Sequence, residues 1–303
     1  MSVSLMLAAL AGQQISIPLG KPVVYEKFPA PIAVAGPAFA RTCGDNDDWD
    51  KPAPPVRIFG NTYYVGTCGI SAILITDKAG DVLIDSGTEK GADLVAANIR
   101  RLGFQLSDVK YLLHSHEHVD HVGGMARLQQ LTGAQLVASA PAAQVFRTGV
   151  TAADDPQAGI LPRVPTVTVG RIVKDGDTVR SGGLQLTATA TPGHTAGALS
   201  WSWVSCDGGV CRTMVFADSL SPVSRDDYRF TDHPAWVASL RQGIAKMAGL
   251  ECDILLTPHP GASNMRQRFG GTAALFDPEG CRNYAAAKTK ALDERLAKEA
   301  PSK

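Results

Sequence analysis

The chain has no excess of charge of either sign. Its 303 residues carry 29 Lys and Arg against 29 Asp and Glu, so the formal net charge at pH 7 is zero. Without a basic field, a protein has no general electrostatic attraction for nucleic acid or anionic lipid. The C-terminal stretch KTKALDERLAKEAPSK mixes both signs, as a solvated helix does. We therefore expect a small-molecule substrate and no nucleic-acid partner.

Long hydrophobic runs are also missing. No stretch reaches the roughly 18 apolar residues that read as a membrane-spanning helix. The short apolar run Val3 to Leu10 ends in Ala9-Leu10-Ala11, a small-x-small pattern typical of signal-peptidase sites, although no Lys or Arg precedes it. We predict a signal peptide over residues 1–11, truncated or with a misassigned start, and a single domain over residues 12–303. The expected product is a soluble monomer, exported to the periplasm or secreted.

The motif C-x-x-C does not occur, which argues against a zinc site built on thiolates. Six cysteines in an exported protein favour disulfides instead. Cys206 and Cys211 flank Asp-Gly-Gly-Val between two strand-like runs, so a hairpin would place them opposite each other. Among the pairings that remain open, we predict Cys43 with Cys68 and Cys252 with Cys281.

Low-complexity segments and short-period repeats are absent, and the chain instead alternates strand and helix signals. Strands are predicted over 56–67, 71–77, 80–87, 108–116, 134–140, 169–179, 184–194, 198–204, 213–220 and 252–260. Helices are predicted over 89–103, 122–133, 142–149, Pro234–Leu250 and from about Arg282. This rhythm predicts an α/β fold, a four-layer sandwich of two mixed β-sheets packed face to face with helices on the outer faces. Residues 150–165 show no periodicity, and so long a loop is usually functional, often a lid.

Histidine is scarce, yet four of the seven histidines lie in HSHEHVDH at residues 114–121. Because this stretch ends a predicted strand, His116, His118, Asp120 and His121 can converge from one loop on a pocket above it. Imidazole and carboxylate together suit zinc. Four ligands in six residues exceed what one metal needs if further ligands lie elsewhere in the chain.

Two later turns offer those further ligands. TATPGHTAG presents His194 and CDILLTPHPG presents His259, each at the carboxyl end of a predicted strand, where open α/β sheets place their sites. His114 is predicted to lie on the preceding strand as a structural or supporting residue. His233 lies beside a predicted helix start and is expected to be an ordinary surface residue.

In their order along the chain, HSHEHVDH, TPGHTAG, FADSL and TPHPG resemble the metallo-β-lactamase superfamily over roughly residues 50–290. Ser219 stands where one lactamase subclass has a zinc-binding cysteine. Together with GNTYYVGTCGIS and the six cysteines, this resembles the third subclass. The resemblance implies two Zn²⁺ per chain, the first on His116, His118 and His194 and the second on Asp120, His121 and His259.

The same resemblance implies a hydrolase that opens the β-lactam amide of penicillins, cephalosporins and carbapenems, and so confers antibiotic resistance. A zinc-bound hydroxide would attack the carbonyl without a covalent intermediate. Asp120, His116 and His118 are the implied catalytic residues, with Asp120 orienting the hydroxide. A serine nucleophile is not expected: Ser107 to Lys110 matches S-x-x-K by chance, since S-D-N and K-T-G are missing. The metalloprotease motif H-E-x-x-H is also not met at Glu117.

Substrate contacts are predicted at three positions. Ser219 and Ser221, two apart beyond a strand, are expected to point the same way and to hydrogen-bond the substrate carboxylate. Gln157 in the long loop is a further predicted contact. The alternative function is a thioesterase or lactonase of the same fold, similar to glyoxalase II. In those relatives an aspartate near the position of Asp218 bridges both metals, but we expect Asp218 to support the ligand turns instead.

Overall fold

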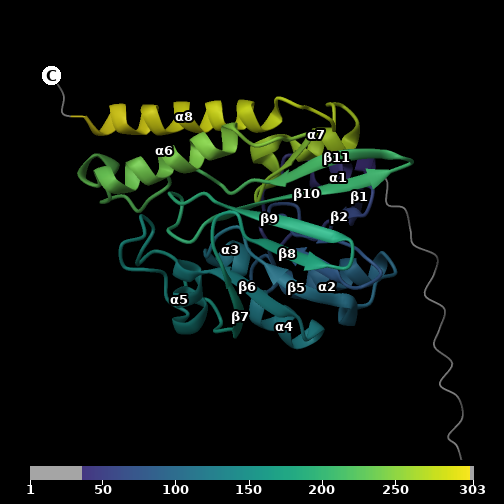
Figure 1. The fold of residues 1–303 in the computed structure, drawn as a ribbon. Coiled ribbons are helices and arrows are strands. Elements are labelled where there is room, and N and C mark those ends of the chain that lie inside the picture. The colour runs from purple at the N-terminus through teal and green to yellow at the C-terminus, as the bar shows by residue number, and fades with distance from the viewer. Residues whose placement is uncertain (1–35, 301–303) are drawn as a thin grey trace, which may run out of the picture.

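The computed structural model describes residues 36–300, whose elements form two sheets between two layers of helices (Figure 1). The predicted signal peptide over residues 1–11 lies outside the described residues. Within residues 36–300, no helix combines the length and the apolar character that crossing a bilayer requires.

The first sheet has seven strands in chain order, antiparallel from β1 to β4 and parallel from β4 to β7. They are β1 (Val56–Phe59), β2 (Thr62–Tyr64), β3 (Ile73–Ile75), β4 (Asp81–Ile84), β5 (Val109–Leu113), β6 (Gln135–Ser139) and β7 (Val169–Val173). The crossovers between the parallel strands carry α2 (Gly91–Arg101), η1 (Leu106–Asp108), α3 (Val119–Val122), α4 (Met125–Thr132) and α5 (Ala140–Thr148). Parallel strands need such crossovers, because the chain must return to the same end of the sheet.

The second sheet has five strands in the order β12-β11-β10-β9-β8, and only β11 and β12 run parallel. Its strands are β8 (Thr178–Ser181), β9 (Leu184–Ala190), β10 (Leu199–Asp207), β11 (Val210–Phe216) and β12 (Ile254–Leu256). The later helical segments are η2 (Phe230–Asp232), α6 (Pro234–Ala248), η3 (Pro260–Ser263), α7 (Met265–Gly270) and α8 (Gly280–Glu299). The short helices α7 and α1 (Gly36–Cys43) were not predicted, since each is too short to show a clear period.

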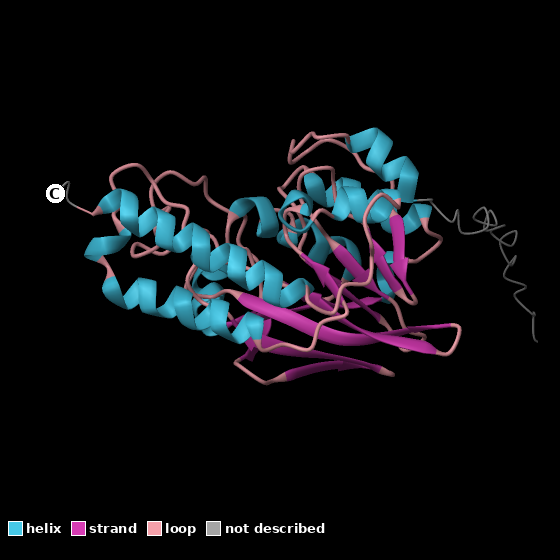
Figure 2. Ribbon diagram, turned by 90° about the horizontal axis from the view of Figure 1, so that it is seen from above, coloured by secondary structure: helices cyan, strands magenta, loops and turns pink. Residues whose placement is uncertain are grey.

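Three apolar layers hold the sandwich together. The central layer lies between the sheets and includes Ile84 and Leu113 from the first sheet and Trp201 and Phe216 from the second. A second layer joins the first sheet to α2, α4 and α5, and a third joins the second sheet to α6 and α8. Figures 1 and 2 show the long helices α6 and α8 side by side on the outer face. The predicted four-layer sandwich of two mixed sheets is therefore confirmed.

The helix predicted over residues 122–133 is wrong at its start. Val122 ends α3, and a new helix, α4, begins only at Met125. A Cβ atom on Gly124 would lie 2.8 Å from the Cβ of Ala92 and 2.9 Å from the carbonyl oxygen of Ser86. The backbone here packs against the chain after β4, and this contact holds the turn that carries Asp120 and His121.

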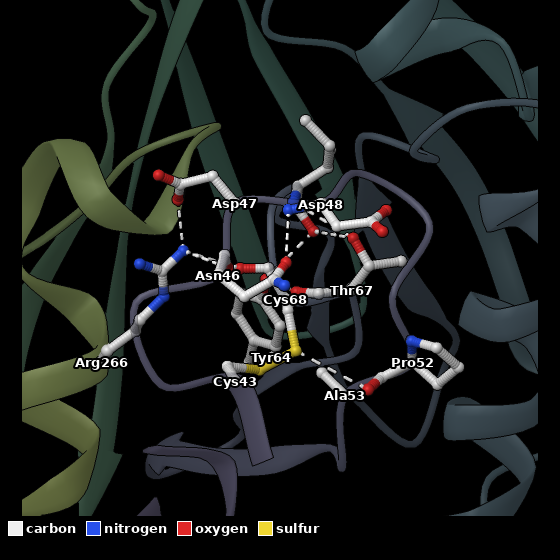
Figure 3. Close-up of a disulfide and its surroundings, with 12 residues drawn as sticks. Cys43, Asn46, Asp47, Asp48, Pro52, Ala53, Tyr64, Thr67, Cys68 and Arg266 are labelled. Carbon is white, nitrogen blue, oxygen red and sulfur yellow. Dashed lines mark hydrogen bonds and ion pairs between the residues drawn. A yellow bond between two sulfur atoms is a disulfide. The ribbon is translucent and has the colours of Figure 1, made fainter. Parts of the chain in front are cut away.

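The structure contains the three predicted disulfides. Cys206–Cys211 crosses the β10–β11 hairpin between two residues paired in register, and Cys252–Cys281 joins the segment before β12 to α8. Cys43–Cys68 joins α1 to the loop after β2, beside Arg266 (Figure 3). Arg266 donates hydrogen bonds to the carbonyl oxygens of Asn46 at 2.8 Å and Cys68 at 3.2 Å, so the α7 region is tied to the same loop.

Candidate metal centre

Both sheets contribute to the candidate metal centre. HSHEHVDH follows β5 of the first sheet, where His118 is still extended with φ −82° and ψ 153° before α3 begins. His194 follows β9 and His259 follows β12, both in the second sheet. The extended-to-helical change after His118 directs Asp120 and His121 back toward the histidines that precede them, as the sequence predicts.

The first group of potential ligands consists of His116, His118 and His194. Each offers a nitrogen atom, and these atoms lie within 4.8 Å of one another. The three rings are buried, with centroids 4.6 to 5.1 Å apart. The Nε2 atom of His116 is buried without a hydrogen-bond partner. An orphaned imidazole nitrogen facing two others fits a metal ion, because a buried polar atom without a partner is costly.

The second group consists of Asp120, His121 and His259. Asp120 Oδ2 lies 3.0 Å from His121 Nε2 and 3.4 Å from His259 Nε2, and the two nitrogens are 3.2 Å apart. His259 has the most open side chain of the three, 38% exposed. The two groups adjoin, since His116 also lies within 4.8 Å of the ligand atoms of Asp120 and His121. The structure thus brings all six sequence-predicted ligands together.

Hydrogen bonds from Nδ1 fix the orientation of the His116 and His194 rings. His116 Nδ1 donates to Asp218 Oδ1 at 2.9 Å, and His194 Nδ1 donates to the carbonyl oxygen of Ser221 at 2.9 Å. Each bond leaves Nε2 as the unprotonated nitrogen, the form in which imidazole binds a metal. The other oxygen of Asp218 accepts from the backbone N–H of Leu220 at 3.2 Å. Asp218 therefore lies behind His116, as expected, and not between the two ligand groups.

The long loop after α5 holds His118. His118 Nε2 donates to Asp155 Oδ2 at 3.1 Å, which leaves Nδ1 as the free nitrogen. The side-chain nitrogen of Gln157 lies 3.4 Å from that Nδ1, and the backbone N–H of Gln157 donates to Asp155 Oδ1 at 2.7 Å. The loop predicted to be functional is therefore built against the metal centre, with Asp155 and Gln157 both buried.

Asp85 supports the second group. It follows β4 with a positive φ of 61°, a conformation that costs free energy in a residue other than glycine. Its carboxylate accepts from the backbone N–H and the hydroxyl of Ser115, each at 2.7 Å. Asp85 Oδ2 also lies 3.4 Å from His121 Nδ1. The strained residue thus joins the end of β4 to the ligand stretch.

The electrostatics of the two groups differ. Burial, together with the neighbouring imidazoles, lowers the pKa of His116 well below 6.5, and the pKa of His194 is lowered in the same way. Burial alone would lower the pKa of His121, but the carboxylates of Asp120 and Asp85 raise it to about 10. His116 and His194 are therefore neutral, and each can donate a lone pair to a metal ion. In the second group, a divalent cation would replace the imidazolium as the partner of Asp120.

Two other residues of HSHEHVDH have structural contacts. The Glu117 carboxylate accepts from the Thr195 hydroxyl at 2.7 Å and from the backbone N–H of Gly197 at 2.9 Å, joining the stretch to the turn of His194. His114 Nε2 accepts from the backbone N–H of Ser139 at 3.2 Å. His114 lies just beyond the end of β5 and not on the strand as predicted, but its contact is structural and it belongs to neither ligand group. His233 is an exposed residue that stacks on Tyr228, as predicted.

The argument used to predict that Ser219 and Ser221 point the same way does not hold in the structure. Strand β11 already ends at Phe216, and Leu220 has a φ of 48°, so strand alternation does not relate the two serines. Ser219 Oγ is buried without a hydrogen-bond partner. Ser221 Oγ donates to the carbonyl oxygen of Ser219 at 3.0 Å and accepts from Lys288 Nζ at 2.7 Å. Ser221 nevertheless contacts His194, because its carbonyl oxygen accepts from His194 Nδ1 at 2.9 Å.

Sequence reasoning missed Asp85 and Asp155. A signal existed for Asp85, because it directly follows a strand that lies parallel to the one carrying the histidines. Asp155 lies in an irregular loop, where no spacing rule predicts which aspartate turns inward.

Comparison with solved structures places these features in a known group. The chain is 58% identical to the MIM-2 metallo-β-lactamase, over 88% of this chain and 99% of that one, with a TM-score of 0.85. It is 49% identical to the metallo-β-lactamase MIM-1 from Novosphingobium pentaromativorans, over 86% and 97%, also with a TM-score of 0.85. MEM-A1, a subclass B3 metallo-β-lactamase from a soil metagenome library, is 42% identical over 83% and 98%, with a TM-score of 0.78.

Curated proteins match more distantly. A hydroxyacylglutathione hydrolase of Rhodopseudomonas palustris (strain BisB5) is 30% identical over 128 residues, which is 42% of this chain. The match spans only 41% of the length of that relative. The family model for the metallo-beta-lactamase superfamily matches residues 65–259, more than half of the chain. The chain therefore belongs to the metallo-β-lactamase superfamily, as a hydrolase whose solved structural neighbours include B3 metallo-β-lactamases.

Proposed function

We propose that this protein hydrolyses the β-lactam amide bond of penicillins, cephalosporins and carbapenems with two zinc ions. The observation that carries the proposal is the pair of adjoining ligand groups at one edge of the sandwich, in a chain 58% identical to a metallo-β-lactamase. His116, His118 and His194 would hold one ion, and Asp120, His121 and His259 the other. When bound, zinc supplies Lewis-acid polarisation of the lactam carbonyl and makes water acidic enough to attack it near neutral pH.

The residues of the chain orient the reaction. Asp120 is buried, and its Oδ2 faces His121 and His259, so we assign it the task of orienting the attacking water through its carboxylate. Its pKa is held well below the ordinary value by His121 and His259 against the effect of burial, so it remains an acceptor. Asp218 and Asp155 hold the rings of His116 and His118 in one tautomer each.

Substrate binding would involve the segment after β11 and the long loop. All three substrate classes carry a carboxylate beside the lactam ring, and hydroxyl groups are suitable donors to it. Ser219 offers a buried hydroxyl without a partner, and Ser221 lies two residues further on. The side-chain nitrogen of Gln157 lies 3.4 Å from His118 Nδ1, and we propose that Gln157 also contacts the substrate.

The second candidate function is thioester hydrolysis, which the similarity to hydroxyacylglutathione hydrolases favours. A bridging aspartate would be needed near position 218 by analogy with those relatives. Both oxygens of Asp218 are instead engaged, with His116 and with the backbone N–H of Leu220. This geometry supports the lactamase proposal over the thioesterase alternative.

We also infer that the protein works in an oxidising compartment, either the periplasm or outside the cell. Three disulfides and no free cysteine in the described residues support this inference, because disulfides are rare in reducing compartments.

One set of assays tests the proposal. The purified protein is mixed separately with a chromogenic cephalosporin, a carbapenem, a glutathione thioester and an acyl lactone, each with and without chelator. We expect hydrolysis of the β-lactams alone, its loss with chelator and its recovery on adding zinc. Turnover of the thioester in preference to the β-lactams would favour the second candidate, and turnover that survives the chelator would exclude the metal mechanism.

A further inference from the structure

Lys288 of α8 reaches the edge of the candidate substrate site. Its ammonium group donates to Ser221 Oγ at 2.7 Å and lies over the ring of Tyr284, 4.8 Å from the ring centroid. The carbonyl oxygen of the same Ser221 accepts from His194, a ligand in the first group. Only one residue therefore separates this ammonium from the metal centre.

The position of Lys288 is fixed by its own helix. One turn earlier on α8, the Tyr284 hydroxyl hydrogen-bonds the carbonyl oxygens of Asp218 at 2.9 Å and Ser219 at 2.8 Å. Cys281 on the same helix forms a disulfide with Cys252. These contacts hold α8 against the segment after β11, which keeps the backbone of Lys288 within reach of Ser221.

The ammonium group lacks a counter-ion. Among residues 36–300, no carboxylate lies within ion-pair distance of Lys288. The nearest acidic influence is Asp218, whose charge raises the pKa of Lys288 only from a distance. By contrast, Lys246 of α6 is paired with Asp175 at 2.9 Å. Burial lowers the pKa of Lys288 to about 8, which still leaves it mostly charged at pH 7. A partly buried cation that has a hydroxyl and an aromatic ring as neighbours but no anionic partner is incompletely compensated, and an anionic ligand would supply the missing charge.

We propose that Lys288, together with the Ser221 hydroxyl, binds the carboxylate of the substrate. This inference rests on the proposed lactamase function and deepens it, because it makes Lys288 the residue that selects anionic β-lactams over neutral ones. The lysine would hold the carboxylate while the lactam carbonyl faces the metal centre. The contact between Lys288 and the carboxylate would stabilise the bound substrate and the transition state alike. Losing it should therefore affect KM more than kcat.

The test compares a cephalosporin with its neutral methyl ester. In the Lys288→Met variant we expect KM for the acid to rise roughly tenfold or more, as for a lost hydrogen bond to a charged group, with little change in kcat. The kinetic constants for the ester should stay within about twofold of wild type. Lys288→Arg keeps the charge and should recover most of the preference for the acid. Lys290→Met, an exposed lysine on the same helix, is the matched control and should change neither substrate.

Three other outcomes would contradict the proposal that Lys288 binds the substrate carboxylate. If Lys288→Met weakens the acid and the ester equally, or lowers the melting temperature and both activities together, the lysine has only a structural role. If wild type already fails to prefer the acid, no carboxylate is bound there. Failure of wild type to hydrolyse any β-lactam would instead refute the proposed function itself, and the inference with it.

Discussion

Asp155 decides which nitrogen of His118 is free to bind a metal ion, because it accepts a hydrogen bond from Nε2 at 3.1 Å. Without that carboxylate the ring can rotate and exchange tautomers. We expect Asp155→Ala to weaken zinc binding about 10- to 100-fold, the usual effect of losing such a supporting residue. The measurement is a zinc titration against a chromophoric chelator. The adjacent and exposed Asp154 provides the control, since Asp154→Ala should bind zinc normally. Equal affinities for both variants would contradict this role.

His259 completes the second ligand group, which we propose holds a second metal ion. It is the partly exposed member of its group, so its removal should leave the fold intact. We expect His259→Ala to retain about one zinc ion per chain and to lose most of its turnover, because only the first group stays complete. Native mass spectrometry would count the ions. His233→Ala removes a histidine that only stacks on Tyr228 and should keep both ions. Two ions retained after the loss of His259 would show that the second group is misassigned.

Lys288 gives the proposed substrate site a distinct pH dependence. Burial lowers its pKa from 10.5 to about 8, so the ammonium loses its proton near pH 8 and not near pH 10. The groups facing it are Ser221, the Tyr284 ring and the Asp218 carboxylate. We expect KM for an anionic cephalosporin to rise as the pH increases through about 8. The ratio of KM values between Lys288→Met and wild type should fall over the same range. A constant ratio from pH 6 to 9 would contradict the prediction.

At the scale of single elements, the disulfides differ in the length of the chain loop that each one closes. Cys252–Cys281 closes a loop with a sequence separation of 29, whereas Cys206–Cys211 closes one of 5 at the tip of a hairpin. Chain entropy predicts stabilisation of about 3.6 kcal/mol for the longer loop and about 2 kcal/mol for the shorter one.

Replacing each cysteine pair by serine tests this difference. We expect the Cys252/Cys281 variant to lose roughly 1.5 kcal/mol more free energy of unfolding than the Cys206/Cys211 variant, measured by urea denaturation. Only the first variant should also raise KM, because α8 carries Lys288. If the hairpin variant were the less stable of the two, loop closure would not explain the contribution of these bonds.

At the scale of the whole molecule, the candidate metal centre takes its potential ligands from both sheets. His116 and His118 follow β5 of the seven-stranded sheet, while His194 follows β9 of the five-stranded one. A ligand that binds only the folded state stabilises it, by about 4 kcal/mol when the free concentration is 1,000 times Kd. We therefore expect chelator to lower the melting temperature in scanning calorimetry, and zinc to restore it. A His116→Ala/His194→Ala variant, which lacks two ligands of the first group, should respond much less. An unchanged melting temperature in wild type would contradict a centre shared by both sheets.

Much of this protein could be predicted from local sequence. Strand and helix periods determined the four layers, and the spacing of HSHEHVDH with two later strand-end histidines determined which six side chains meet. Where a local cue was incomplete, the prediction failed: the helix predicted from Val122 breaks at Gly124, because the backbone packs against Ala92 and Ser86. Strand alternation could not relate Ser219 to Ser221, because β11 ends at Phe216 and Leu220 adopts a positive φ.

Only the tertiary structure decided how the ligand rings are oriented and where a free cation lies. Asp155 meets His118 across 37 residues of sequence, and Lys288 meets Ser221 across 67. Residue types that bind metal can be recognised from short spacings, because neighbouring positions share one turn or strand. Tautomers, shifted pKa values and unpaired charges depend on groups that become neighbours only when the two sheets and their outer helices pack together.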